Sequence, residues 1–376
     1  MLEKRYKIGF DAKRAFNNGT GLGNYSRFII KALLEMAGSF DYFAFTPKVN
    51  PKFNFFLSEK NLQTRLPQIS EFKFLWRSYF IVKELKKEGI DLFHGLSNEL
   101  PYGLKKNNIK SVVTIHDLIF LHFPNHYPFI DRIIYRFKFK YAAQQADKII
   151  AVSEQTKKDL VRFYDIAPSK IAVIYQDCDE AFKKIILAQS ILKTKEKYGI
   201  RQEYILCVGS IIERKNQLTL VKAFQKLNHD KVQLVLVGSK SAYQSEIEKY
   251  IQTHQLQNIQ ILNKVPFEDL PALYQGASVF VYPSIYEGFG IPILEALYSG
   301  VPVIAAKGSC LEETGGEAAL YFEPKDTKQL SNLLTEILTD HDKSKKLLAK
   351  SKEQLMNFLP QKIALQTQQV YNEVLF

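Results

Sequence analysis

Short apolar segments alternate with helix-like segments along almost the whole chain. Each apolar segment is bounded by polar or turn residues, as buried parallel strands are. These predicted strands are Tyr6–Phe10, Tyr42–Thr46, Leu92–His94, Ser111–Ile115, Ile149–Val152, Ile171–Ile174, Tyr204–Val208, Leu234–Val237, Ile259–Leu262, Val279–Tyr282 and Val301–Ala305. Such alternation of strands and helices predicts two doubly wound α/β domains.

The length of 376 residues also favours two domains over a single core. The polar stretch Tyr175–Glu203 predicts the connection between them. We therefore expect a first domain over residues 1–187, a second over 188–360 and a last helix over 361–376. Other expected helices are one after Ser153, which is a suitable N-cap, and those over Gln217–Lys226 and Asp269–Gly276.

The stretch PSIYEGFGIPILE, which starts at Pro283, predicts a ligand site. It follows a predicted strand, contains Gly288 and Gly290, and leads into a helix that we expect to begin at Pro292. A helix N-terminus after a glycine loop binds anions such as phosphate. Glu287 and Glu295 stand on either side of the loop. A phosphate site with two carboxylates suits a ligand that is rich in both phosphate and hydroxyls, such as a nucleotide-sugar.

A purely structural interpretation of this stretch is also open. Many α/β proteins place a Gly between strand and helix for packing alone. Glu295 would then be a solvated helix residue, and Glu287 a charge favoured by the helix dipole. The whole string, with a carboxylate at each end, favours the ligand site.

Two adjacent cations, Arg214 and Lys215, follow the predicted strand that ends at Val208. Doubly wound sheets bind ligands at the carboxyl ends of their strands, and two cations there could bind a diphosphate. A basic helix start is the structural alternative, but the helix dipole disfavours it.

His116 and Asp117 likewise follow the end of a predicted strand and are well placed to take part in catalysis or binding. His94, also at a strand end, is the weaker candidate.

Two other motifs have rival interpretations. Gly19, Gly21 and Gly23 form a loop that suggests a dinucleotide fingerprint, but their spacing is GxGxG rather than GxGxxG. Asp177 and Asp179 form a DxD pair of the kind that holds a metal, but they lie in the connecting stretch, and fixed cations make a metal unnecessary. We therefore predict no metal and no cofactor.

Taken in order, these strings resemble those of the retaining glycosyltransferases of family 4, which have the GT-B fold. In that family two carboxylates eight positions apart bracket EGFG-type glycines, as Glu287 and Glu295 do here. Further agreeing strings are GFDA at 9–12, TGLGNY at 20–25, VTIHDL at 113–118, ADKIIAVSE at 146–154, ERKN at 213–216 and GVPVI at 300–304. The RKN and HDL strings most resemble the mannosyltransferase-like subgroup.

The resemblance implies two Rossmann-like domains facing across a cleft and a metal-independent transfer of a hexose, with a lean to mannose. The donor would be a nucleoside diphosphate sugar and the acceptor a polysaccharide or glycolipid, with no nucleic acid involved. The resemblance implies that His116 and Glu287 contact the donor sugar and act in catalysis, and that Arg214 and Lys215 stabilise the leaving group. It implies an acceptor-side role for Asp117 and places Val265 near the nucleoside base. The other residues that would bind the donor are Gly21, Gly23, Gly288, Phe289, Gly290, Ile291 and Glu295. The commoner family pattern has an Arg where this chain has Ser210, so Arg214 would take over that position's role. An NAD-dependent enzyme and a catalytically silent partner subunit remain open.

The excess of positive charge lies in the first half of the chain, where residues 1–187 hold 30 Lys and Arg against 19 Asp and Glu. Two basic segments with aromatics, Phe72–Phe80 around Trp76 and Arg132–Lys140, suggest contact with an anionic membrane. Solvated helix faces with aromatics turned to the core are the alternative. No apolar run approaches the length that spans a bilayer, and three scattered cysteines predict a reduced, cytoplasmic protein. The two basic segments would place it at the inner face of the membrane.

Overall fold

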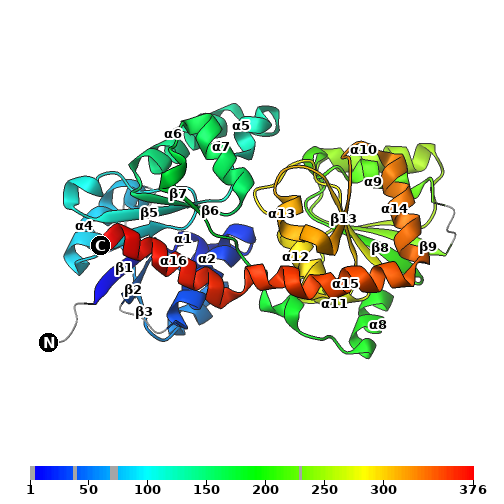
Figure 1. The fold of residues 1–376 in the computed structure, drawn as a ribbon, viewed down its shortest axis with the longest axis horizontal. Coiled ribbons are helices and arrows are strands. Elements are labelled where there is room, and N and C mark those ends of the chain that lie inside the picture. Colours follow the sequence, from blue (N-terminus) through cyan, green and yellow to red (C-terminus); the bar gives the residue numbers. More distant parts are fainter. Residues whose placement is uncertain (1–4, 37–39, 68–74, 228–230) are drawn as a thin grey trace. The chain divides into compact units, whose positions relative to one another are not determined.

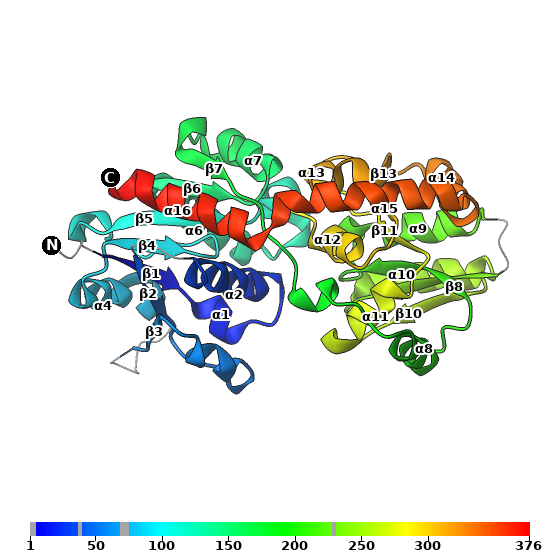
Figure 2. The same cartoon turned by 60° about the horizontal axis from the view of Figure 1, so that its bottom comes forward.

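A computed structural model describes residues 5–36, 40–67, 75–227 and 231–376. The chain divides into two compact units (Figures 1 and 2). Unit 1 comprises residues 1–177 and 358–376, and unit 2 comprises residues 178–357. Phe72, Lys73 and Phe74 of the first basic segment lie outside the described residues.

Unit 1 contains a parallel sheet of seven strands. Their order is β3 (Leu62–Arg65), β2 (Phe40–Phe45), β1 (Tyr6–Asp11), β4 (Leu92–Gly95), β5 (Lys110–Ile115), β6 (Lys148–Ala151) and β7 (Ile171–Val173). The helices are α1 (Lys13–Asn17), α2 (Gly21–Leu34), α4 (Ile81–Glu88), α5 (Ile119–His122), α6 (Phe129–Gln145), α7 (Glu154–Tyr164) and α16 (Pro360–Leu375).

Two apolar clusters hold the helices of unit 1 against its sheet. One joins Phe10 of β1 to Ile29 of α2 and Tyr371 of α16. The other joins Phe93 of β4 to helices α4, α6 and α7. The last helix therefore packs beside α2 within unit 1, although its residues follow those of unit 2 in the sequence (Figure 2).

Unit 2 contains a parallel sheet of six strands. Their order is β10 (Ile259–Leu262), β9 (Val232–Val237), β8 (Glu203–Val208), β11 (Val279–Tyr282), β12 (Val303–Ala306) and β13 (Ala319–Phe322). The helices are α8 (Ala188–Lys197), α9 (Gln217–Phe224), α10 (Ala242–Thr253), α11 (Leu270–Gln275), α12 (Ile291–Tyr298), α13 (Leu311–Gly315), α14 (Thr327–Thr339) and α15 (His341–Leu355).

Both sheets are doubly wound, and each has a point where the strand order reverses. That point lies between β1 and β4 in unit 1 and between β8 and β11 in unit 2. Open α/β sheets bind ligands outside the carboxyl ends of the strands at such a point. The loops that follow these four strands are therefore the candidate ligand-binding loops.

The predicted α/β class and all the predicted strands are confirmed. The sequence patterns missed the edge strands β3 and β13. Three details were wrong: α12 begins at Ile291 rather than Pro292, the expected connecting stretch contains α8, and residues 21–25 are the first turn of α2 rather than a loop. Ser153 caps α7 as predicted, because its Oγ accepts a hydrogen bond from the Thr156 N–H at 3.0 Å.

Within the residues that the structure describes, no helix is both long enough and apolar enough to cross a membrane.

Candidate active site

The loop between β11 and α12 packs closely against helix α13 and the loop that precedes it. A Cβ on Gly290 would lie 2.9 Å from Oγ1 of Thr314, so a larger residue there would have to displace the threonine. The Ser309 hydroxyl accepts the Glu287 N–H at 3.3 Å. The buried Cys310 thiol donates to the Glu287 carbonyl at 3.3 Å. These contacts fix the position of the Glu287 backbone.

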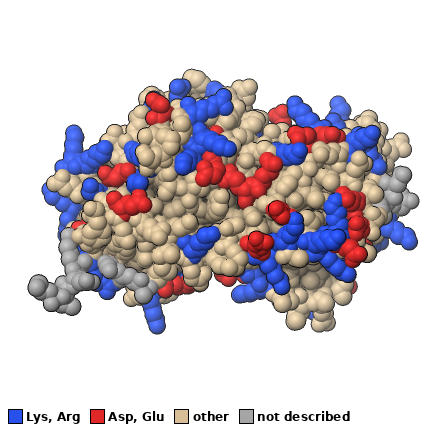
Figure 3. All heavy atoms as spheres, viewed as in Figure 1, with Lys and Arg blue, Asp and Glu red and all other residues tan. Residues whose placement is uncertain are grey.

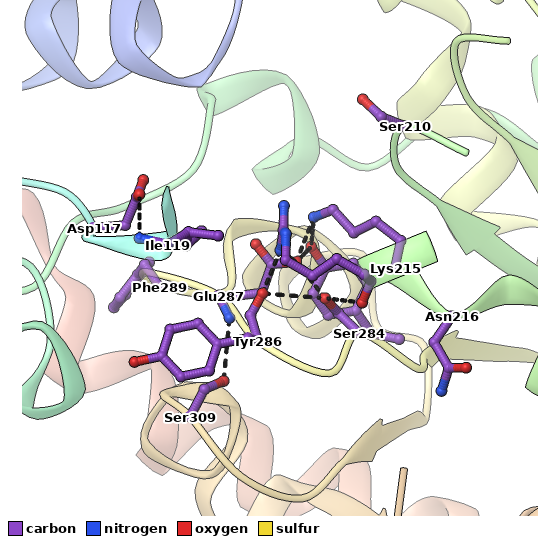
Figure 4. A network of polar contacts seen from close by, with 12 residues as sticks. Asp117, Ile119, Ser210, Lys215, Asn216, Ser284, Tyr286, Glu287, Phe289 and Ser309 are labelled. Carbon is purple, nitrogen blue, oxygen red and sulfur yellow. Dashed lines mark hydrogen bonds and ion pairs between the residues drawn. The ribbon is translucent and has the colours of Figure 1, made fainter. Parts of the chain in front are cut away.

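The side chain of Glu287 is the centre of a buried ionic cluster (Figure 4). Its Oε1 lies 2.7 Å from Nη1 of Arg214 and 2.5 Å from Nζ of Lys215. The same oxygen accepts hydrogen bonds from the Tyr282 hydroxyl at 3.1 Å and from the Ser284 hydroxyl. Four side chains therefore converge on one carboxylate oxygen.

Electrostatics keep this cluster charged. Burial alone raises the pKa of Glu287, but Lys215 and Arg214 outweigh it, so the pKa lies below the usual range. Burial lowers the pKa of Lys215, and Glu287 opposes that shift. Glu287 is therefore an ionised carboxylate held between two cations, which excludes the interpretation of it as a simple first-turn charge.

The two cations come from the loop after β8, where Glu213–Lys215 form one 3₁₀ turn. Asn216 follows in the left-handed conformation with φ 58°. Its amide donates to the carbonyls of Pro283 at 3.1 Å and Pro324 at 2.6 Å. The Ile285 N–H donates to the Arg214 carbonyl at 2.9 Å. The loops after β8 and β11 are thus joined by hydrogen bonds, and this is where the strand order reverses.

Glu295 lies on α12 and is half-buried, which rules out the solvated helix residue of the alternative interpretation. The Tyr274 hydroxyl on α11 donates to its Oε2 at 2.7 Å. Burial, with a smaller contribution from Asp179, raises the pKa of Glu295 to about 7. The two predicted carboxylates therefore differ, since Glu287 is firmly ionised and Glu295 titrates near neutrality.

In unit 1, His116 directly follows β5 and is buried. Its Nε2 lies 2.9 Å from the Leu96 carbonyl, which can only accept, so Nε2 carries the proton and Nδ1 is left as an acceptor. Burial lowers the pKa of His116 to about 4, so the ring is neutral. Tyr25 of α2 packs edge-on against this ring at 4.6 Å between centroids.

The remaining predicted residues of unit 1 lie at the same sheet edge. Asp117 follows His116, and its Oδ1 accepts the Ile119 N–H at 3.1 Å at the start of α5. Gly21 and Gly23 occupy the first turn of α2. A Cβ on Gly23 would lie 1.8 Å from the Asn18 carbonyl oxygen, so that position requires glycine. His94, the weaker candidate, is fully buried, and its ring is hydrogen-bonded to the hydroxyls of Tyr371 and Thr114.

Other predicted residues lie elsewhere in unit 2 or at its boundary. Val265 is half-buried after β10, at the carboxyl end of that strand. Gly288 and the buried Phe289 complete the loop before Ile291. Asp179 accepts the Ala181 N–H at 2.9 Å and so caps a short 3₁₀ turn. Among the described residues there is no group of three or more His, Cys, Asp or Glu that could hold a metal ion.

Sequence patterns missed a second ionic cluster, at the carboxyl edge of the unit 1 sheet. Arg77 Nε donates to Asp11 Oδ2 at 2.7 Å, and its Nη1 lies 3.0 Å from Glu99 Oε2. Lys138 Nζ lies 3.0 Å from the same Glu99 oxygen. Asp11 is 66 positions from Arg77 in the sequence. The one sequence signal for this pairing is the position of Asp11 at the end of a predicted strand.

Two family models match the chain. Residues 20–179 match Glycosyltransferase Family 4, and residues 190–354 match Glycosyl transferases group 1. Together the two matches span most of both units.

The chain is similar to O-antigen chain mannosyltransferase B of Escherichia coli, with 30% identity over 66% of this chain and 65% of that protein. It is 29% identical to the O-antigen chain mannosyltransferase RfbU of Salmonella typhimurium over 60% of each chain. The matched region thus spans less than two thirds of these relatives. The structure of HepE from Anabaena in complex with UDP-glucose superposes with a TM-score of 0.75 at 18% identity, over 98% of this chain and 99% of that one. The fold is that of the GT-B glycosyltransferases.

Proposed function

This chain belongs to the glycosyltransferases, with a Family 4 domain followed by a group 1 domain; from its site we propose a retaining, metal-independent hexosyltransferase. The donor would be a nucleoside diphosphate sugar, and the acceptor a polysaccharide or a lipid-linked glycan. The observation that carries the proposal is the cluster of Arg214, Lys215 and Glu287 at the point where the unit 2 strand order reverses.

Arg214 and Lys215 are proposed to bind the diphosphate of the donor. Both side chains are largely buried, at 11% and 14% exposure, so their charges are poorly screened by water. Negative charge develops on the leaving diphosphate as the sugar departs, and preorganised cations stabilise that charge more than they stabilise the bound donor. The backbone N–H groups at the start of α12 would add to this stabilisation.

Glu287 is proposed to hold the donor sugar. The four contacts described above reach Oε1. We assign Oε2 to the sugar hydroxyls, as an acceptor whose direction is fixed by the bonds to Oε1. Glu295 would accept hydrogen bonds from the ribose hydroxyls, with its orientation set by Tyr274.

Retention of configuration is proposed to occur by substitution on the front face. The acceptor oxygen forms a bond to the anomeric carbon as the bond from that carbon to the phosphate oxygen breaks, and the acceptor proton passes to the departing phosphate. Glu287 is unsuited to act as a nucleophile because two cations already neutralise it. The neutral His116 would accept a hydrogen bond from the donor sugar through Nδ1.

Mannose is the proposed sugar because the two O-antigen relatives described above are named as mannosyltransferases. A lipid-linked or polysaccharide acceptor fits the same relatives, which are named for the O-antigen chain. We also propose a cytoplasmic location, where the three buried free thiols would stay reduced.

The experiment is transfer of labelled mannose from GDP-mannose to bacterial membrane lipids, with UDP-glucose as the competing donor. Incorporation should persist in excess EDTA and in the variant Asp177→Asn/Asp179→Asn, and the product should keep the anomeric configuration of the donor. Strict dependence on added Mn²⁺ or Mg²⁺, or an inverted product, would contradict the proposed mechanism. Donor binding without any transfer or donor hydrolysis would point instead to a catalytically silent partner.

A further inference from the structure

Helix α6 of unit 1 carries an apolar stripe on its solvent side. The stripe consists of Phe129 (67% exposed), Ile130 (69%), Ile133 (41%), Ile134 (42%) and Phe137 (72%). These positions recur at helical spacing and lie on one face. The opposite face holds the helix in the core through Phe139, Ala142 and Ala143. Exposed apolar residues are ordinary when single, whereas a contiguous patch marks a binding surface.

Cations accompany the stripe. Arg136 and Lys140 are exposed on the same helix, and the guanidinium of Arg132 lies 5.3 Å from the ring centroid of Phe129. The only acidic residue of α6 is Asp131. In the space-filling view, Lys and Arg stand out along the upper edge of unit 1, where Figure 1 places α6 and α7 (Figure 3). The stripe is therefore apolar at its centre and basic at its margin.

The structure joins this helix to the other basic segment of the sequence. Tyr79, which is 53% exposed, stacks on Tyr102 at 4.9 Å, and Tyr102 contacts Tyr141 of α6 at 4.3 Å. Glu99 binds both Arg77 and Lys138, one from each segment. Exposed aromatic surface from both segments is thereby brought to one side of unit 1.

Two residues of that segment do not contribute, contrary to the expectation from sequence. Trp76 is 3% exposed, and its indole N–H donates to Glu84 at 2.8 Å. Arg77 is bound on both sides by acidic residues. Trp76 and Arg77 therefore add nothing to the surface, which consists of the α6 side chains with Tyr79 nearby.

We propose that the α6 stripe docks unit 1 on an anionic lipid bilayer, with the apolar side chains in the interface and Arg132, Arg136 and Lys140 on the lipid phosphates. A helix with an apolar face and basic flanks lies in the plane of a membrane interface in this way. A second copy of the chain is a poorer occupant, because docking the stripes together would bring two strongly basic halves into contact, each with 30 Lys and Arg against 19 Asp and Glu. The inference rests on the proposed function in that a lipid-linked acceptor gives the docking its purpose.

The test is co-sedimentation of the full chain with vesicles of phosphatidylcholine alone or with phosphatidylglycerol. Binding should require the anionic lipid and weaken as salt rises. Arg136→Glu/Lys140→Glu should lower partitioning by at least about 25-fold, since each cation lost costs about fivefold. The matched control is Lys346→Glu/Lys352→Glu, which makes the same charge change at exposed sites on α15 and should bind nearly as the wild type does.

A second pair of variants tests the apolar part. Ile130→Ser/Phe137→Ser should reduce binding while leaving thermal stability unchanged, because both side chains are exposed. The control Ile185→Ser/Leu192→Ser removes exposed apolar side chains from unit 2 and should bind normally. Equal loss in variant and control, or absence of vesicle binding at low salt, overturns the proposal. So does a wild-type dimer that Ile130→Ser/Phe137→Ser converts to a monomer.

Vesicle binding is measured without any donor, so it separates this inference from the proposed function. Transfer to membrane lipids by a protein that ignores vesicles would overturn the docking alone. Vesicle binding by a protein that transfers nothing would leave the docking standing and contradict the transferase assignment.

Discussion

Nζ of Lys215 lies 2.5 Å from Oε1 of Glu287, so a cation assigned to the donor diphosphate and a carboxylate assigned to the donor sugar form one buried ion pair. Arg214 binds the same oxygen at 2.7 Å. Replacing any one of the three therefore alters the other two. Function and stability have to be measured together in each variant.

Removing both cations should abolish transfer. In Arg214→Ala/Lys215→Ala, each lost charge-assisted phosphate contact should cost roughly 1.5–3 kcal/mol of transition-state stabilisation. The variant also leaves the Glu287 carboxylate buried without a cation beside it, which should lower the free energy of unfolding by about 3–5 kcal/mol. Steady-state kinetics and urea denaturation measure the two effects.

Lys307→Ala is the control, because Lys307 pairs with Glu323 at the surface of the same unit and should change stability by at most about 1 kcal/mol. Turnover near the wild-type value in the double variant would remove both cations from the mechanism.

Nucleotide affinity should depend on the ionisation of Glu295. Its pKa of about 7 means that a nucleoside diphosphate should bind up to about tenfold more tightly at pH 8 than at pH 6, as the carboxylate gains its charge. Calorimetric titration across this range measures the slope. Glu295→Gln should bind the nucleotide weakly. Its affinity should keep only the pH dependence that comes from ionisation of the ligand phosphate. An unchanged slope in the variant would exclude Glu295 from ribose binding.

The same pKa predicts a trend in stability. The folded pKa of Glu295 lies above its ordinary value of 4.5, so between the two the native state holds more protons than the unfolded state. This contribution to stability is fully present below pH 4.5 and is lost as pH rises through about 7. In Glu295→Gln the free energy of unfolding should fall less over that window, as urea denaturation at several pH values would show.

His116 should act as a neutral hydrogen-bond acceptor. Because its pKa lies near 4, the transfer rate should show no histidine titration between about pH 6 and 8. His116→Ala should lower kcat by about tenfold, the size of one neutral hydrogen bond, with little change in the KM for the donor. Loss of activity with a midpoint near pH 6.5 in the wild type, absent from the variant, would show that the ring exchanges protons instead.

The position of Gly290 against Thr314 should be required for donor binding. In Gly290→Ala the new methyl would press on the Thr314 side chain and shift the loop, at a cost of about 1–3 kcal/mol. The donor KM should rise accordingly. Adding Thr314→Ala should recover part of the loss, whereas Thr314→Ala alone should bind the donor almost normally. Equal KM values in all three variants would show that the loop does not set the donor position.

Sequence patterns predicted most of the fold, because buried parallel strands appear as continuous apolar runs. They missed β3 because that strand, LQTR, buries only Leu62 and lies at the sheet edge. They also predicted Arg214, Lys215 and Glu287 as site residues, and the structure brings these three side chains together in loops at strand ends.

What the patterns could not predict depends on contacts between distant residues. The pattern around Arg77 predicts a basic surface, but the Arg77 side chain is only 11% exposed and pairs with Asp11 at the end of β1 and Glu99 after β4. The raised pKa of Glu295 arises from burial under α11 and has no local signature. Similarly, the convergence of four side chains on Oε1 of Glu287 depends on how two loops pack.

Thermal unfolding with a panel of nucleoside diphosphates, their sugars and NAD⁺ tests the central claim most directly. A ligand at about 100 times its Kd stabilises the native state by about 2.7 kcal/mol, which raises Tm measurably. We predict that one nucleoside diphosphate and its hexose conjugate raise the Tm of the wild type in the presence of EDTA, and that neither does so in Arg214→Ala/Lys215→Ala. A shift with NAD⁺ alone, or an undiminished diphosphate shift in the double variant, would contradict the assignment of the Arg214, Lys215 and Glu287 cluster as the donor site.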